Sequence, residues 1–171
     1  TMIQYANNAF RTCGLSANDY METTTSFAAS MLSSVGGDTA KAAELSNNAL
    51  IAMSDNANKM GTNMQDIQNA YQGFAKQNYT MLDNLKLGYG GTKEEMQRLL
   101  SDANKLNKQQ GIITDYSIDS FADITEAIQV VQDNLGITGT TALEAASTLS
   151  GSFGTMQAAW TNFIAKLSVG N

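Results

Sequence analysis

The sequence offers few side chains that could carry out catalysis. There is no histidine among the 171 residues, which removes the commonest general base near neutral pH and the usual ligand of zinc sites. The single cysteine, Cys13, cannot form an internal disulfide, and a small apolar core residue is its ordinary interpretation. Triads and Cys-His dyads are therefore excluded, and we expect no enzyme here.

Carboxylates are the remaining groups that could do acid-base or metal chemistry. Glu94 and Glu95 are adjacent, so on a helix they point to different sides and do not form the facing pair that a glycosidase needs. Asp115, Asp119 and Asp123 are spaced by four residues, which could crowd their carboxylates around calcium. The EF-hand pattern with its central glycine is missing. We predict no catalytic residue, no metal site and no cofactor.

A glycine-rich turn at residues 88–91, followed by Thr92 and Lys93, invites comparison with a phosphate-binding loop. The spacing of the Walker motif is absent, and no strand clearly precedes the turn. Thr92 and Glu95 instead form a capping box, in which the hydroxyl accepts the Glu95 amide and the carboxylate returns to the Thr92 amide. The stretch therefore predicts a turn and the start of a helix.

The elements around this turn are predicted to be helical. Apolar residues recur at three and four positions along most of the chain, proline is absent, and glycines mark the ends of segments. We predict an all-α fold, a compact bundle of seven or eight helices. The expected helices are 2–12, 16–35, 38–60, 63–76, a helical turn at 81–85, 93–109, 121–135, 141–149 and 153–167.

The chain divides into three parts at the least regular stretch. Residues 1–111 form an expected N-terminal helical body, residues 112–120 a loop or hinge, and residues 121–171 a C-terminal helical part. The segment from Ile112 to Ile118 is compatible with a strand, but it is short and a loop is the better interpretation. Two subdomains are therefore possible in the predicted bundle.

The charge is low and acidic, with a net charge of −6. Nucleic-acid binding needs clustered basic residues, so nucleic acid is not an expected partner. Six of the ten basic residues fall within residues 76–108, whereas residues 109–171 hold one basic and six acidic residues. No run of apolar residues is long enough to cross a bilayer. We expect a soluble fragment excised from a longer protein, with no membrane contact of its own.

Large side chains provide candidates for contacts with other proteins. The nine methionines lie on predicted apolar helix faces, where methionine is an adaptable core filler. Aromatic residues concentrate in protein interfaces. The interface candidates are Tyr71, Tyr79, Tyr89 and Trp160.

Four long segments also carry a family resemblance. They are AYQGFAKQNYTMLDNLKLGYGGTKEEMQRLL at 70–100, GLSANDYMETTTSFAASML at 14–32, MSDNANKMGTNMQDIQNAYQ at 53–72 and GITGTTALEAASTLSGSFGTMQAAWTNF at 136–163. Taken in their order along the chain, these segments resemble the core region of phage tail tape measure proteins, from long-tailed phages or prophages of Gram-positive bacteria. Residues 107–118 depart from the resemblance and are expected to form a variable loop.

The resemblance implies a structural role in the virion. Such a protein lies in the tail lumen, after assembly in the host cytoplasm, and takes part in tail assembly, length determination and genome delivery. The implied partners are the tail tube, the tail initiator or distal tail proteins, and the tail assembly chaperones. Glycines break this chain into short amphipathic helices, so we expect a folded module of the tape measure and not its extended ruler.

Two alternatives belong to other classes. Tape measure proteins as a family sometimes carry cell-wall-cutting domains, so a cell-wall hydrolase or its accessory domain is the second interpretation. A secreted helical hairpin is the third. It is weakened because Trp160 is followed by Thr161 and Asn162 and not by a tight glycine turn between two long helices.

Overall fold

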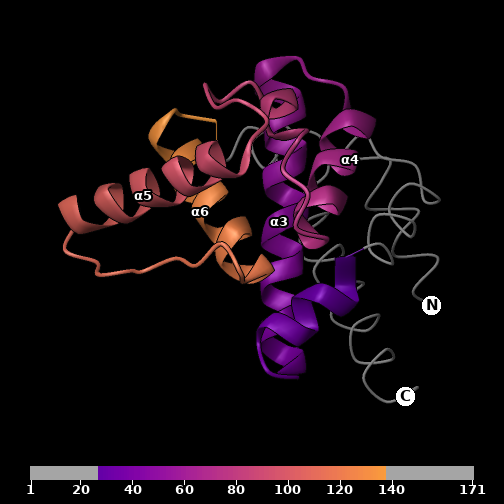
Figure 1. Ribbon diagram of the computed structural model, residues 1–171, viewed down its shortest axis with the longest axis vertical. Coiled ribbons are helices and arrows are strands. Elements are labelled where there is room, and N and C mark those ends of the chain that lie inside the picture. Colours follow the sequence, from indigo (N-terminus) through magenta and orange to yellow (C-terminus); the bar gives the residue numbers. More distant parts are fainter. Residues whose placement is uncertain (1–26, 138–171) are drawn as a thin grey trace, which may run out of the picture.

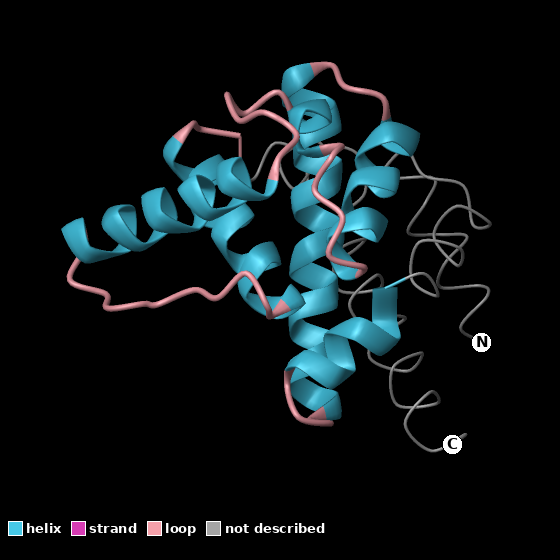
Figure 2. Ribbon diagram, viewed as in Figure 1, coloured by secondary structure: helices cyan, strands magenta, loops and turns pink. Residues whose placement is uncertain are grey.

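The computed structural model describes residues 27–137, and these residues contain helices and no strand (Figure 2). The expected all-α class is confirmed for this part of the chain. The helices expected at 2–12, 141–149 and 153–167 lie outside the described residues, as does Cys13. Helical residues 27–34 come first, followed by α3 (Thr39–Met60), α4 (Met64–Ala75), the 3-10 helix η1 (Leu82–Leu85), α5 (Lys93–Gln109) and α6 (Phe121–Asn134).

The longest helix of the described residues, α3, has the ends that its sequence predicts. The Asp38 side chain accepts the Lys41 amide at the N-terminus, which satisfies one of the free amides of the first turn. At the other end Gly61 adopts the left-handed conformation, with a φ of 66°, where a side chain would be strained. The predicted helix at 38–60 is confirmed.

The next helix, α4, is equally well defined by local bonds. Asn63 accepts the amides of Gln65 and Asp66 at its start. At its end Gln77 has a φ of 62°, and the Asn78 amide donates to the Gly73 carbonyl at 2.8 Å. The chain therefore turns sharply after α4, and the short helix η1 follows where a helical turn is predicted.

Helix α3 is the centre of the described fold, with α4 on one side and α6 on the other (Figure 1). Helix α5 packs chiefly on α6 and extends away from α3. Apolar faces of all these elements meet in one core. Its largest fully buried side chains are Tyr71, Phe27, Phe74, Met31, Leu50, Met53, Ile67, Leu82, Leu85 and Met96.

A buried polar network fastens α3 to α6 and η1. The Asn56 side-chain amide, fully buried, donates to the Gln132 side-chain oxygen at 2.9 Å and to the Leu85 carbonyl at 2.9 Å. Gln132 donates in turn to the Ala52 carbonyl at 3.1 Å, and the Thr62 hydroxyl donates to the Asn56 oxygen at 2.8 Å. One hydrogen bond thus joins the two buried amide side chains, and their other groups bond to backbone carbonyls and to Thr62, a contact that the sequence analysis did not foresee.

Residues 112–120 join α5 to α6 and contain neither helix nor strand, as the loop interpretation predicts. Ser120 then begins α6 by accepting the Asp123 amide. The Ala122 amide donates to the Ser34 hydroxyl at 3.2 Å, so the start of α6 lies beside helical residues 27–34. Within the described residues, α6 therefore shares its core with the helices that precede the loop.

Candidate protein interface

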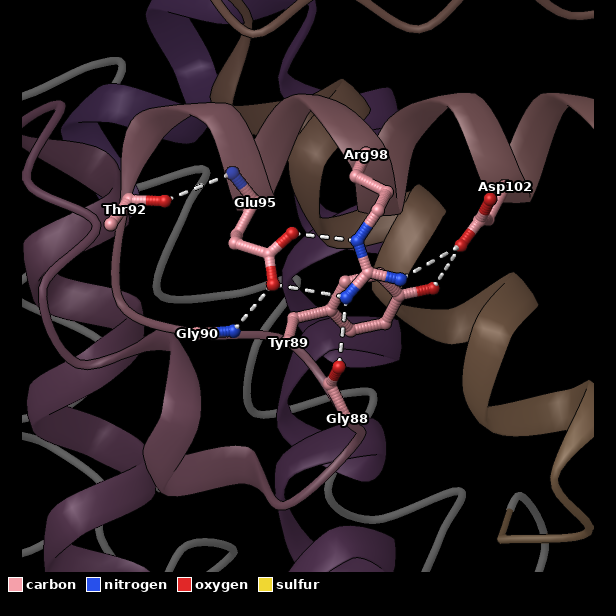
Figure 3. A network of polar contacts seen from close by, with 7 residues as sticks. All are labelled: Gly88, Tyr89, Gly90, Thr92, Glu95, Arg98 and Asp102. Atoms are coloured by element: carbon pink, nitrogen blue, oxygen red, sulfur yellow. Dashed lines mark hydrogen bonds and ion pairs between the residues drawn. The ribbon is translucent and has the colours of Figure 1, made fainter.

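The glycine turn before α5 contains one of the interface candidates, Tyr89, and carries a dense set of hydrogen bonds (Figure 3). Thr92 has an extended backbone, with φ −132° and ψ 161°, and its hydroxyl accepts the Glu95 amide at 3.1 Å. This half of the predicted capping box is confirmed. Helix α5 begins at Lys93, as the sequence indicates.

The other half of the capping box prediction is wrong. The Glu95 carboxylate does not return to the Thr92 amide but accepts the Gly90 amide, at 3.1 Å. The Thr92 amide donates to the Gly90 carbonyl at 3.0 Å instead. The backbone of the glycine turn bends toward the first turn of α5. The Glu95 carboxylate therefore accepts the amide of residue 90 and not, as was expected, that of residue 92.

Arg98 fixes both the carboxylate and the turn. Its guanidinium contacts Glu95 through two nitrogens, Nε to Oε2 at 2.6 Å and Nη2 to Oε1 at 3.0 Å. The same Nη2 donates to the Gly88 carbonyl at 2.8 Å. A planar guanidinium is suited to this paired geometry, whereas an ammonium is a point charge. The Arg98 side chain therefore links the backbone of the glycine turn to the first turn of α5 (Figure 3).

Tyr89 joins the same network through its ring and its hydroxyl group. The Arg98 guanidinium lies 4.2 Å from the centre of the Tyr89 ring, a cation-π contact. The Tyr89 hydroxyl donates to Asp102 at 2.6 Å. Burial, and after it the bond to Asp102, raises the pKa of the Tyr89 hydroxyl above its ordinary value. The phenol is therefore a fixed hydrogen-bond donor and not an acid-base group near neutral pH.

The pKa of Glu95 gives a direct test of this network. The Arg98 hydrogen bonds, and next the Gly90 amide, lower the pKa of Glu95 from 4.5 to about 2. Because the folded-state value lies below the unfolded one, the stabilisation is full above about pH 4.5 and is lost as pH falls toward 2. We expect Arg98→Lys to move the Glu95 midpoint back toward 4.5, measured by NMR titration of the side-chain carboxyl carbon.

The matched control is Lys93→Gln, which removes an exposed charge that has no ion pair with Glu95. This variant should leave the Glu95 midpoint low. A midpoint near the ordinary value in the unmodified protein would contradict the described network.

Beside the turn, α5 and α6 enclose a shallow groove of about 260 Å³. Leu135, at the end of α6, is 49% exposed there, although the apolar spacing of three and four residues in the predicted helix 121–135 assigns it to the buried face. That assignment is wrong because Leu135 follows the last turn of α6 as its C-cap, where the helical period no longer sets its direction. The groove is lined by Leu87, Tyr89, Asp102, Lys105, Leu106, Val131, Asn134 and Leu135.

The aromatic interface candidates do not form one exposed patch. Tyr71 is 0% exposed and packs inside the core against Phe74, so this residue is corrected from an interface to a core role. Tyr79 is 8% exposed, and its hydroxyl donates to the Ile118 carbonyl at 3.4 Å. Tyr89 lines the groove between α5 and α6. Trp160 lies outside the described residues.

The turn has little capacity left for a ligand. The Gly88 carbonyl and the Gly90 amide are both occupied by side chains of α5, and a carboxylate would repel a phosphate placed there. Of the three aspartates considered as calcium ligands, Asp123 accepts the Ser117 amide at 2.9 Å. Residues 27–137 hold no group of three or more carboxylate, cysteine or histidine side chains that could bind a metal ion. No helix among them has the length and apolar character needed to cross a bilayer.

The chain was compared with models of protein families, with curated proteins and with solved structures. None of the three comparisons finds a match.

Proposed function

We propose that this chain is a structural module of a phage tail tape measure protein, acting through protein-protein contacts and not as an enzyme. The four segments named above support the proposal by their resemblance. Two of them, 53–72 and 70–100, fall within the described residues and comprise the end of α3, α4, η1, the glycine turn and the start of α5. These two segments therefore correspond to one continuous stretch of helices and turns.

One contact supports a folded module over an extended ruler. Asn56 and Gln132 are 76 positions apart and their side chains are bonded at 2.9 Å. In one continuous helix, at 1.5 Å per residue, the same positions would be roughly 114 Å apart. A segment that folds back in this way adds little to tail length, so its role is better explained as docking.

The proposal extends to the whole chain and its surroundings. We place the module in the tail lumen of the virion, as a bundle of seven or eight helices with a division at residues 112–120. Its partners would be tail tube, tail initiator or distal tail proteins, and assembly chaperones in the host cytoplasm. The groove between α5 and α6, with its exposed Leu135, is the surface that we propose for such a contact.

Binding to purified tail proteins tests the proposal directly. We expect the chain to bind a purified tail initiator or distal tail protein. Leu135→Ser should lower the affinity about tenfold, as loss of an interface anchor does. Met60→Ser, at a position that is 38% exposed on α3, is the matched control. Failure of the chain to bind any of these proteins, while the full-length tape measure binds, would end the docking role.

Two further measurements separate this proposal from its rivals. Clearing of peptidoglycan in a zymogram would favour a cell-wall hydrolase. Small-angle X-ray scattering should give a radius of gyration of about 16 Å for a folded monomer of this length. A much larger value, with a rod-like scattering profile, would instead assign the chain to the ruler.

A further inference from the structure

A second surface lies at the far end of α5, where the chain reverses into the loop that leads to α6. Figure 1 shows this end extending away from α3 and α4, with the loop returning beneath the helix. The residues concerned are Lys105, Lys108, Ile112 and Ile113, here called the α5 tip. It is distinct from the glycine turn at the other end of α5, and only Lys105 is shared with the groove between α5 and α6.

The loop is held in one conformation by side chains of α5. Asn107 donates to the Thr114 hydroxyl at 3.0 Å and to the Tyr116 hydroxyl at 3.1 Å. Asn104 accepts from the Thr114 hydroxyl at 2.8 Å and from the Tyr116 amide at 3.2 Å. These four bonds tie Thr114 and Tyr116, which follow the two isoleucines, to the last turns of α5. The residues at the turn of the loop are therefore presented in a defined geometry.

What the loop presents is apolar. Ile113 is 80% exposed and its neighbour Ile112 is 50% exposed. A single exposed aliphatic residue is ordinary on a protein surface, but two adjacent isoleucines on a loop braced by four hydrogen bonds form a preorganised contact point. Ile113 also borders a hollow of about 240 Å³, together with Ser101, Asn104, Lys105, Lys108 and Thr114.

The charge beside the isoleucines is positive. Lys105 and Lys108 are exposed, line the same hollow, and form no ion pair with a carboxylate of residues 27–137. Asp115 is exposed on the same loop but does not line the hollow. The chain as a whole carries a net charge of −6, so the tip differs in sign from the protein that bears it.

We propose that the α5 tip binds an acidic segment of another protein, one that carries an aliphatic or aromatic side chain next to its carboxylates. The apolar side chain would contact Ile113, and the carboxylates would pair with Lys105 and Lys108. Complementary charge selects the partner and speeds association, and the braced loop reduces the entropy lost on binding. The exposed isoleucines, the hydrogen-bonded loop and the two lysines would form this contact whether or not the chain belongs to a phage tail.

Selection from a library of displayed short random peptides, with the full chain as bait, tests the proposal. We expect the selected peptides to be enriched in aspartate and glutamate beside leucine, isoleucine or aromatic residues. Their affinity should fall about tenfold with Ile113→Ser, and by a similar factor with Lys108→Glu, as for central interface residues. Isothermal titration calorimetry on selected peptides measures both effects.

Two matched controls accompany these variants. Met81→Ser changes another exposed apolar residue, 42% accessible beside η1, and Lys59→Glu reverses an exposed charge at the end of α3. Both should bind the selected peptides as the unmodified chain does. Peptides that are basic, or that bind Ile113→Ser and Lys108→Glu undiminished, would overturn the proposal. So would light scattering that shows a dimer lost on Ile113→Ser, since a second copy would then be the occupant.

Discussion

Replacing Asn56 with alanine is expected to lower the free energy of unfolding by about 3 kcal/mol. The substitution removes the donor to the Gln132 side-chain oxygen and to the Leu85 carbonyl, and the acceptor for the Thr62 hydroxyl. Gln132 is fully buried, so water cannot readily replace the lost bond. Urea unfolding followed by far-ultraviolet circular dichroism measures the change.

The control for this prediction is Asn134→Ala, an exposed asparagine at the end of α6. Its effect should stay within about 0.5 kcal/mol, as is usual for a surface change. Equal effects of the two substitutions would show that the buried network adds nothing to stability.

A double-mutant cycle isolates the bond between the two amides. Asn56→Ala and Gln132→Ala in one chain should cost less than the separate effects added together, by about 1 kcal/mol, because each single change already breaks the shared bond. The other bonds, from Gln132 to the Ala52 carbonyl and from Asn56 to the Leu85 carbonyl, lie outside the pair. Strict additivity would mean that the two side chains are independent.

The network also marks the limit of what the sequence could predict. Helix ends were predictable because they depend on local bonds, as at Asp38, Thr92 and Gly61. Apolar residues that recur at three and four positions along a predicted helix are likewise buried, as Met53 and Leu99 are. No local rule pairs an asparagine on α3 with a glutamine 76 positions later, because the register of α3 against α6 is set by packing of the whole core.

The candidate site shows the same division. The Thr92 cap was predictable from its spacing to Glu95, but the carboxylate's real partner, Gly90, depends on how the turn bends. Aromatic type alone could not separate Tyr71, which is buried in the core, from Tyr89, which lines a groove. Residue type suggests a role, but burial and the neighbouring groups in the folded chain determine whether the side chain can perform it.

The two adjacent glycines of the turn provide the second large prediction. We expect Gly91→Ala to lower the free energy of unfolding by about 3 kcal/mol, an effect typical of forced overlap in a packed site. A Cβ atom at position 91 would lie 2.2 Å from the Thr80 carbonyl oxygen and 2.9 Å from its carbon. Both are backbone atoms, which cannot rotate away.

Thr80 has little freedom to move aside. Its amide and its hydroxyl both donate to the Asn78 side-chain oxygen, at 3.1 and 2.8 Å, and the Asn78 amide is itself bound to Gly73 at the end of α4. The overlap would therefore push on the turn itself and shift the Thr92 cap and Tyr89. Chemical unfolding measures the cost, and NMR chemical shifts around residues 88–95 would report the displacement.

Gly90→Ala is the matched control, one residue away in the same turn. A Cβ there would meet only the Glu95 side chain, at 3.6 Å from Cγ and 3.7 Å from Oε1, which is ordinary contact. Neither glycine has a positive φ, unlike Gly88 with its φ of 94°, so backbone strain does not separate the pair. Gly90→Ala should therefore change stability by no more than about 0.5 kcal/mol. Equal losses at both positions would show that the turn needs flexible glycines, whereas a loss at Gly91 alone would show that it needs space beside Thr80.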